Sequence, residues 1–549
     1  FAFGVNNLIY HTYLHQPLGD DYLPGMAMGP HGNNWHRHQN WWDMLPAYHS
    51  YVSRASHLLQ QGVSVVDILY LTPEGVPHIF LPPSDALRGE GVIKDKRGYS
   101  FDAVSPRILM NRATVVDERI AFADASQYKI LVLPDAKTMT PQALEKIVEL
   151  VEAGATVVGN PPIKSPSLVN YPNTDEQVKT LASKLWGRLS PPEKITKRRF
   201  GKGTVYWGQA LYWQQNPQAT NDANNEDAFY PSYATTAPLL TEMGLVKDFS
   251  SVGDKLRFTH RKTADKDIYF VANSMETTLK TTASFRVSNV VPQLWHPETG
   301  EIRTLAQYSD SNGIISIPLT FAGHESYFIV FSKQKSKQSN NQVLTTNEAK
   351  QNFPQPKAVI TLEGSWEVSF DSKRGGPEKI TFDKLIDWRE HMEPGIKYYS
   401  GIATYSKTFD LPEEADLSGQ YSIDLGLAYE MARVTLNGVE QGVAWTPPWQ
   451  VTLSGLKSKG NVLTIEVANS WENRLIGDTK GEDANARTVQ WPSGLLNGKP
   501  YKTGRYTFTT YQIRDYSKLE NQDPALQPSG LIGPVRLLSQ PNKPAKEKL

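Results

Sequence analysis

Three kinds of hydrophobic pattern follow one another along the chain. Residues 41–61 carry apolar side chains at the spacing of an amphipathic helix, and Gly62 follows as a helix stop. Between residues 63 and 250, short continuous apolar runs alternate with helical patterns. From residue 255 onward, short alternating segments are separated by turn residues. This order predicts an α/β region followed by all-β regions.

The α/β region has the pattern of a parallel sheet covered by helices. Thr140 is placed to cap a helix over 141–153, with proline at the first helical position and Gly154 as the stop. Strands that alternate with helices predict a flavodoxin-like, doubly wound α/β domain over 63–250. No glycine-rich phosphate-binding pattern follows these strands, so we expect no nucleotide there. Continuous apolar runs predict buried strands at 65–72, 129–134, 155–159 and 204–208.

The second half of the chain has the pattern of two antiparallel β units. Short strands separated by turns predict a small β-sandwich over 251–333. Residues 334–357 are polar and have the composition of a linker. Further strands, with a hairpin turn at Asn437-Gly438, predict a galactose-binding-like jelly roll over 358–540. The tail 541–549 is predicted to be disordered.

The opening stretch differs from everything that follows. Residues 8–14 form an apolar run that predicts a strand, and this run leads into a loop rich in Gly, Pro, aromatic and titratable residues. Functional groups of (β/α) barrels lie at the carboxyl ends of their strands. We therefore predict that residues 1–62 are the C-terminal end of a (β/α)8 catalytic barrel. A complete barrel takes ~250 residues, so we expect most of it to precede Phe1.

Histidines and tryptophans gather in this opening stretch. At the end of the predicted strand, His11 and His15 could hydrogen-bond to sugar hydroxyls, or they could only pack there. Tryptophan rings could stack on a sugar face, although one of an adjacent pair such as Trp41 and Trp42 is usually a core residue. The predicted substrate-binding residues are His11, His15, His31, His36, His38, Trp35, Trp41 and Trp42.

Metal binding is an alternative for the same stretch. A zinc set of His31, His36 and His38 lacks an HExxH spacing, and the chain has no Cys. Sugar contacts or hydrogen bonds that tether the loop are therefore favoured for these histidines. The opening stretch also contains three carboxylates whose oxygens suit calcium: Asp20, Asp21 and Asp43. Aspartate is also common in surface turns and at helix starts, which is the alternative explanation.

Composition narrows the possible partners. The formal net charge is +0, so no basic surplus favours nucleic acid, and no apolar run approaches the ~20 residues of a membrane span. Aromatic residues make up 10% of the chain, which suits oligosaccharide ligands but also ordinary β-sandwich cores. The absence of Cys excludes disulfides and thiolate catalysis and favours an exported protein, periplasmic or secreted.

Several motifs resemble one known family. GVNNLIYHTYLHQP, PGMAMGPHGNNWHRHQNWWDM, VDILYLTPEG and LWHPETG resemble segments of glycoside hydrolase family 106, the α-L-rhamnosidases. The C-terminal motifs PGIKYYSGIATYSKTFDL and NVLTIEVANSWENRLIGD are similar to the sugar-binding jelly roll of family 2 glycosidases. The resemblance implies an exported enzyme that carries calcium and releases terminal α-L-rhamnose from plant or algal polysaccharide with inversion.

The same resemblance implies where the catalytic groups lie. Inversion needs an acid and a base carboxyl ~6.5–9.5 Å apart with a water between them. The family's two glutamates lie on earlier barrel strands, and the opening stretch has no match for them. Glu74 belongs by position to the α/β domain. The chain is therefore expected to carry one side of the active site without the catalytic carboxylate pair.

Three functions remain open at this point. The first is the C-terminal part of an α-L-rhamnosidase, the second is a non-catalytic carbohydrate-binding scaffold, and the third is a β-galactosidase-like glycosidase. The scaffold would use the jelly roll as a lectin-like module. The residues of that unit that could form a sugar-binding face, or could only brace the fold, are Trp445, Trp449, Trp471, Asn437, Asn469, Asn473 and Arg474.

Overall fold

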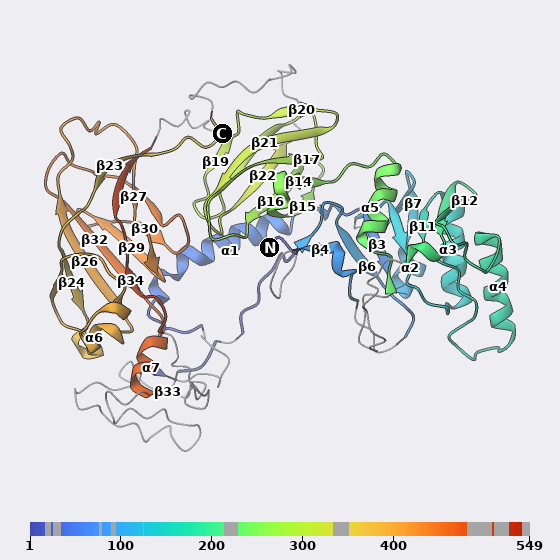
Figure 1. Ribbon diagram of the computed structural model, residues 1–549, viewed down its shortest axis with the longest axis horizontal. Coiled ribbons are helices and arrows are strands. Elements are labelled where there is room, and N and C mark those ends of the chain that lie inside the picture. The colour runs from blue at the N-terminus through green and yellow to red at the C-terminus, as the bar shows by residue number, and fades with distance from the viewer. Residues whose placement is uncertain are drawn as a thin grey trace.

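Three units lie in a row in the computed structural model of this protein (Figure 1). An α/β unit stands at one end, a β-sandwich in the middle and a second β unit at the other end. The structure describes residues 1–11, 13–16, 23–25, 35–75, 80–88, 95–123, 126–212, 229–332, 351–479, 508–509 and 526–540.

A single helix joins the middle and C-terminal units. The 3₁₀ turn η1 (Trp42–Met44) leads directly into α1 (Leu45–Leu59), which confirms a helix within the predicted range 41–61. The helix ends at Leu59 with Gln60 as its C-cap, so the predicted stop at Gly62 is wrong. Ala55 and Leu59 pack into the apolar face of the middle sandwich. Leu45, at the other end of α1, packs against the C-terminal unit. The helix therefore buries a different end against each β unit.

The α/β unit is built on a six-stranded sheet with the order β12-β13-β11-β10-β3-β6. All neighbours are parallel except the pair β12 and β13, which is antiparallel. The four buried strands predicted from the sequence are confirmed. The strands are β3 (Ile68–Leu71), β6 (Phe101–Val104), β10 (Ile130–Val132), β11 (Thr156–Val158), β12 (Thr196–Phe200) and β13 (Gly203–Trp207).

Helices cover both faces of this sheet, which explains its continuous apolar strands. Leu69 and Leu71 face the core under α2 (Pro106–Arg112), α3 (Pro141–Ala153) and α4 (Asn173–Trp186). Ile68 and Tyr70 face the opposite core under α5 (Tyr233–Glu242). The Thr140 hydroxyl accepts from the Ala143 N–H, so the predicted cap of α3 is confirmed. The doubly wound arrangement expected for this region is present.

A small three-stranded sheet stands beside the main one. It consists of β7 (Thr114–Val116), β8 (Arg119–Ala121) and β9 (Gln127–Tyr128), all antiparallel. A two-stranded antiparallel sheet pairs β4 (Leu87–Arg88) with β5 (Asp95–Lys96).

The middle unit is an antiparallel sandwich of two sheets around one apolar core. The four-stranded sheet holds β14 (Phe249–Ser251), β17 (Leu279–Phe285), β20 (Ser309–Ser311) and β21 (Ile314–Phe321). The six-stranded sheet holds β2 (Val63–Ser64), β15 (Leu256–Lys262), β16 (Lys266–Asn273), β18 (Val291–Trp295), β19 (Ile302–Thr304) and β22 (Ser326–Ser332). Because β2 pairs with β15, the chain leaves this sandwich only after residue 64 to enter the α/β sheet.

The C-terminal unit also packs two antiparallel sheets on a shared core. The four-stranded sheet holds β23 (Lys357–Thr361), β27 (Tyr421–Asp424), β31 (Gln450–Leu453) and β35 (Arg536–Ser539). The six-stranded sheet holds β24 (Trp366–Phe370), β25 (Ile380–Phe382), β26 (Ile402–Phe409), β29 (Met431–Leu436), β30 (Val439–Ala444) and β32 (Asn461–Ala468). Smaller elements are β28 (Ala428–Tyr429), β34 (Gly530–Leu531), α6 (Pro394–Lys397) and α7 (Glu472–Thr479).

The hairpin turn predicted in this unit is confirmed. Asn437 and Gly438 join β29 to β30 with φ values of 51° and 82°, which is the left-handed conformation that Asn-Gly adopts in tight turns. The finer assignment of the unit as a galactose-binding-like jelly roll stays a prediction.

The opening stretch does not follow its sequence pattern. The strand predicted over 8–14 is wrong, because the described residues 1–11 and 13–16 contain no strand. An extended segment becomes a strand only when a neighbour accepts its backbone hydrogen bonds, and no described strand lies alongside it. In the described part of the first 62 residues, the strand present is β1 (Pro24–Gly25), paired with β33 (Phe508–Thr509). The barrel therefore stays a prediction. Most of the predicted linker and the whole tail lie outside the described residues.

Candidate functional site

The segment after the opening loop is fastened to the C-terminal unit. We call residues 35–45 the docking segment. The Asn40 amide donates to the Asn469 carbonyl at 2.9 Å, and the Arg374 guanidinium donates to the Asn40 side-chain oxygen. The Trp471 indole N–H donates to the His38 carbonyl at 2.8 Å. These bonds join residues more than 300 positions apart, so the docking segment is held by tertiary contacts rather than by its own secondary structure.

An aromatic cluster forms where the docking segment meets α1 and β30. Trp35 stacks on Tyr48 with ring centroids 5.9 Å apart and meets Trp41 edge-on at 5.6 Å. Tyr10 meets Trp35 edge-on at 4.6 Å, and Tyr48 meets Trp445 at 5.2 Å. Such edge-on and offset pairs are favourable geometries for aromatic rings. We call Tyr10, Trp35, Trp41, Tyr48, His49 and Trp445 the aromatic cluster.

The tryptophans of this region divide between core and surface. Trp41 is 8% exposed and packs with Met44 and Met431, so it is a core residue of the junction. Trp35 and Trp42 are partly buried. Trp42 lies 6.3 Å from the exposed ring of Tyr13. One member of the adjacent pair is thus structural, and Trp35 and Trp42 keep part of a ring accessible.

The histidines divide in the same way. His36 and His38 are 3% and 4% exposed, and the His36 Nδ1 accepts from the His38 backbone N–H at 3.2 Å. Burial, with help from His38 and Arg37, lowers the pKa of His36 to about 4, so its ring is neutral at neutral pH. His11 and His15 are exposed on the segment before the loop, where a ligand could reach them. His31 lies outside the described residues.

Two carboxyl groups at this junction escaped the sequence analysis. Glu430 stands just before β29, and burial raises its pKa, with Ser470 and Trp41 as hydrogen-bond partners that oppose the rise. Nearby Glu472 opens α7, and burial raises its pKa as well. No spacing pattern connects either residue to Trp41. Only the docking of distant segments brings them together.

The polar residues once considered as a sugar-binding face contact protein here. Asn469 donates to the Tyr399 carbonyl at 2.9 Å and accepts from the Gly401 N–H at 3.0 Å. Asn473 donates to the Gln527 carbonyl at 2.7 Å. Asn469, Asn473, Arg474 and Trp471 are each at most 3% exposed. These contacts support the bracing role for this part of the set.

The described residues do not provide a calcium or zinc site. In the ranges that the structure describes, no group of three or more His, Asp and Glu side chains is placed to hold a metal ion. Asp43 is exposed, while Asp20 and Asp21 lie outside those ranges. The groups available here therefore do not fit a metal centre by themselves.

Glu74 has a structural partner. Its carboxylate accepts from the Thr140 backbone N–H at 2.6 Å and from the Thr140 hydroxyl at 2.7 Å. It sits after β3 and supports the start of α3, where a negative charge is favourable. This position agrees with its predicted place in the α/β domain.

Comparison with known proteins identifies the class and then the family. A family model described as alpha-L-rhamnosidase matches residues 1–310, more than half of the chain, which places the protein among the glycoside hydrolases. The chain belongs to glycoside hydrolase family 106. None of the helices in the described ranges is long and apolar enough to cross a membrane.

Two relatives extend over nearly the whole chain. The solved structure of a rhamnosidase from a Novosphingobium species is 30% identical and superposes with a TM-score of 0.77, covering 98% of this chain and 45% of that one. A protein of Formosa agariphila named "Putative beta-glucuronidase" is 25% identical and covers 98% of this chain. This chain spans 60% of that relative. It thus covers about half the length of the relatives it matches.

Proposed function

We propose that this chain is part of an α-L-rhamnosidase that releases terminal α-L-rhamnose from plant or algal polysaccharide with inversion of configuration. The observation that carries the proposal is the family match over residues 1–310 together with the rhamnosidase fold over 98% of the chain. The relatives are longer than this chain. We infer that the acid and base carboxyls lie in the part of their length that this chain does not span.

The residues described here would bind and orient the sugar. Exposed His11 and His15 offer ring nitrogens to sugar hydroxyls, and the accessible parts of Trp35 and Trp42 offer flat apolar faces. The buried side chains of the docking segment would keep it in position against the C-terminal unit; these are His36, His38 and Trp41. The three units behind this stretch would then support one wall of the active site.

Export and calcium are further parts of the proposal. The chain has no Cys, which suits an oxidising compartment. Calcium follows from the family resemblance, and no step of the reaction is assigned to it here. Loss of activity on treatment with a chelator, restored by added Ca²⁺, is the expected result for the full enzyme.

The deciding experiment is an activity assay with paired aryl glycosides. The full-length protein should hydrolyse nitrophenyl α-L-rhamnoside and leave the β-D-galactoside and β-D-glucuronide intact. Proton NMR of the first-formed sugar should show the β-anomer, as inversion requires. Turnover of a β-glycoside instead would overturn the substrate assignment. Saturable binding of oligosaccharide with no turnover of any glycoside would favour the non-catalytic scaffold.

A further inference from the structure

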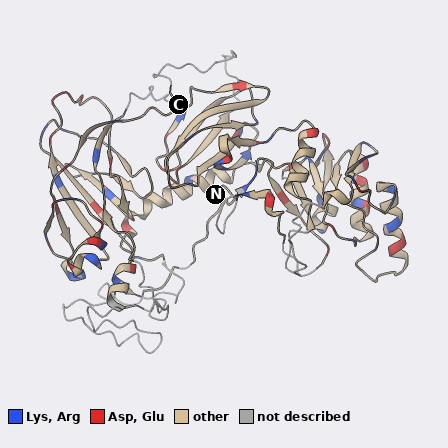
Figure 2. Ribbon diagram, in the orientation of Figure 1, with Lys and Arg blue, Asp and Glu red and all other residues tan. Residues whose placement is uncertain are grey.

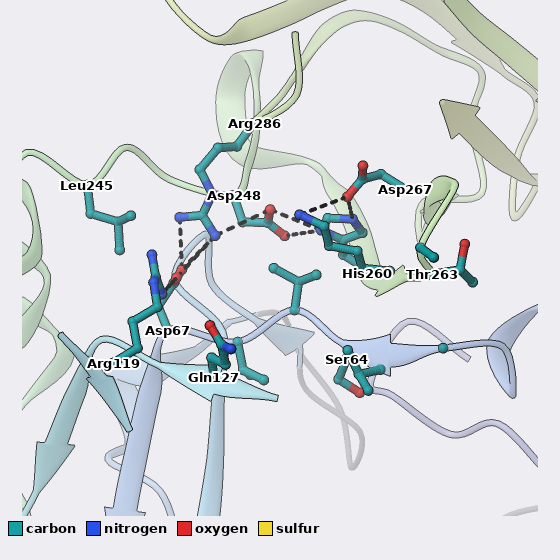
Figure 3. A pocket seen from close by; sticks show the side chains of 16 residues that line it. Ser64, Asp67, Arg119, Gln127, Leu245, Asp248, His260, Thr263, Asp267 and Arg286 are labelled. Atoms are coloured by element: carbon teal, nitrogen blue, oxygen red, sulfur yellow. Dashed lines mark hydrogen bonds and ion pairs between the residues drawn. The ribbon is translucent and has the colours of Figure 1, made fainter. Parts of the chain in front are cut away.

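A cleft opens between the α/β unit and the middle sandwich, away from the docking segment. Its volume is about 770 Å³, and its walls come from residues 62–67, the β8–β9 hairpin, β15, the turn after it and Arg286 (Figure 3). Ligand sites typically measure ~300–1,000 Å³ and often lie where two structural units meet. We call this space the junction cleft.

A row of alternating charges runs along the floor of the junction cleft. Arg286 binds both carboxylate oxygens of Asp67 at 3.1 Å and lies 3.5 Å from Asp248. Asp248 contacts the His260 Nδ1 at 3.0 Å, and Asp267 contacts the His260 Nε2 at 3.2 Å. Figure 3 shows this row extending from Arg119 and Asp67 to Asp267. Formally, the acidic and basic groups nearly balance.

The acidic side chains of the junction cleft are less exposed than the basic ones. The side chains of Asp67 and Asp248 are each 1% exposed, and that of Asp267 is 10% exposed. Those of Arg286, Arg119 and Lys262 are 18%, 29% and 51% exposed. The carboxylates therefore lie behind the cations, and the surface that a ligand meets is positive. Charges of both signs are interspersed over the coloured parts of the three units in Figure 2, so this positive wall is a local feature.

Among the described residues, two cations on the wall are held only by long ion pairs. Arg119 lies 3.9 Å from Asp67 and Lys262 lies 3.9 Å from Asp267, and both carboxylates hydrogen-bond to other partners. Gln127 pairs directly opposite Ala121 across β8 and β9, and Arg119 lies two residues before Ala121. Arg119 and Gln127 consequently point from the same face of the hairpin.

We propose that the junction cleft binds an acidic sugar through its carboxylate or sulfate group. Arg119 from the α/β unit would hold the anion, and Gln127 on the same face would bond to a neighbouring hydroxyl. Lys262 from the sandwich stands beside Asp267 at the other end of the row and would add to the positive potential of the cleft. The cleft is much larger than a bare inorganic ion, and mixed cationic and amide donors suit a hydroxylated anion. The junction cleft lies apart from the proposed rhamnose site. The inference that the anionic group belongs to a sugar, rather than to another acidic molecule, rests on the proposed function.

Calorimetric titration of the full chain with three probes tests this site. D-glucuronate supplies the carboxylate, inorganic sulfate supplies the sulfate group, and D-glucose is the neutral match. We expect saturable binding of glucuronate, of sulfate or of both, and none of glucose at the same concentration. The anion that binds identifies the source of the charge. Arg119→Ala should weaken binding at least tenfold, and Arg119→Lys should weaken it less than Arg119→Ala. Lys262→Ala should weaken binding by a smaller factor, about threefold, because Lys262 acts through the potential of the cleft.

Matched controls separate local charge from a general salt effect. Arg107→Ala and Lys280→Ala remove exposed cations elsewhere and should leave binding unchanged. Both cleft cations are surface side chains, so circular dichroism should show all variants folded. Absence of saturable binding of both anions, equal binding of glucose, or unchanged affinity in both cleft variants would overturn the proposal. Turnover of the aryl rhamnoside by the full enzyme should persist in Arg119→Ala, so failure of this site is distinguishable from failure of the rhamnosidase assignment.

Discussion

His260 is the residue whose chemistry depends most on its surroundings. Each of its ring nitrogens faces a carboxylate, Asp248 on one side and Asp267 on the other, and its ring stacks on Tyr269 at 3.7 Å. A carboxylate only accepts hydrogen bonds, so both nitrogens must carry a proton and the ring must be an imidazolium. Burial opposes the charge, but the two carboxylates outweigh burial and raise the pKa of His260 above its ordinary value.

Replacing this histidine should destabilise the middle sandwich in a pH-dependent way. His260→Gln removes the imidazolium between the buried carboxylates of Asp248 and Asp267, which should cost about 3 kcal/mol of unfolding free energy at pH 6. The pKa of His260 is higher in the folded protein than the 6.5 of the unfolded chain, so its charge contributes its full stabilisation at any pH below 6.5. This stabilisation is lost as the pH rises through the pKa of the folded protein. The difference between wild type and variant in urea denaturation should therefore shrink toward pH 9.

A surface histidine provides the control for this measurement. His324→Asn changes an exposed residue in a left-handed turn, where Asn is tolerated, and should leave the unfolding midpoint unchanged. If the loss of unfolding free energy in His260→Gln stays constant from pH 6 to pH 9, the ring of His260 is not held as an imidazolium.

His36 illustrates the opposite environment. Burial near other basic groups lowers its pKa to about 4, so the folded protein binds this proton less readily than the unfolded chain. The contribution of His36 to the free energy of unfolding is therefore complete above pH 6.5 and is lost as the pH falls toward 4. As the pH rises, the contribution of His260 to the free energy of unfolding falls and that of His36 grows. The spacing of residues in the sequence does not show which histidine behaves in which way.

His15 tests the functional assignment at the same scale. Its side chain is exposed, so His15→Ala should change the unfolding free energy by less than about 0.5 kcal/mol. If it binds sugar, the activity of the full enzyme on an aryl α-L-rhamnoside should fall at least tenfold. The exposed His57 on α1 supplies a matched His57→Ala control with full activity expected. Intact specific activity with a large loss of stability in His15→Ala would mean that the residue only packs.

At the scale of elements, local rules succeeded where the chain supplies its own partners. The helix over 141–153 begins and ends at the residues that its cap and glycine indicate, because a helix satisfies its own backbone groups. The apolar run at 8–14 has strand composition but no neighbouring strand among the described residues. A strand depends on a partner that composition does not reveal.

The docking segment is an element held by a few identifiable bonds. Asn40→Ala removes its bonds with the Asn469 carbonyl and with Arg374, which should cost about 2 kcal/mol of local stability. Hydrogen–deuterium exchange over residues 35–45 should accelerate markedly, while exchange in the α/β sheet stays the same. Asn111→Ala, on the exposed side of α2, is the matched control. Unchanged exchange over 35–45 would mean that the aromatic cluster and the bond from Trp471 to the His38 carbonyl hold the segment without Asn40.

At the scale of the whole molecule, Arg286 links two units. It reaches from the sandwich to Asp67, which stands at the entrance to β3 of the α/β sheet. Burial raises the pKa of Asp67 to about 6, although Arg286 opposes the rise. The guanidinium is thus the group that lets Asp67 keep its charge at neutral pH between two packed units.

Removing this link should uncouple the two units. In Arg286→Ala, calorimetry should resolve separate unfolding transitions for the α/β unit and the sandwich at pH 7, because Asp67 and Asp248 remain buried without the guanidinium. The defect should lessen toward pH 5, where Asp67 takes up a proton. Lys280→Ala, an exposed cation on β17, should behave as wild type. A single cooperative transition in Arg286→Ala at pH 7 would contradict this role.

The sequence by itself determined the order of the units, the ends of the helix over 141–153, the hairpin at Asn437-Gly438 and the family. These features arise from neighbours within a few residues or from motifs, so local patterns are enough to encode them. Only the tertiary structure decided that Trp41 and His36 are buried while His15 is exposed, that Glu430 lies beside Trp41, and that cations stand in front of carboxylates in the junction cleft. Those outcomes depend on surfaces that meet across tens to hundreds of residues, and burial and charge are set where the surfaces meet.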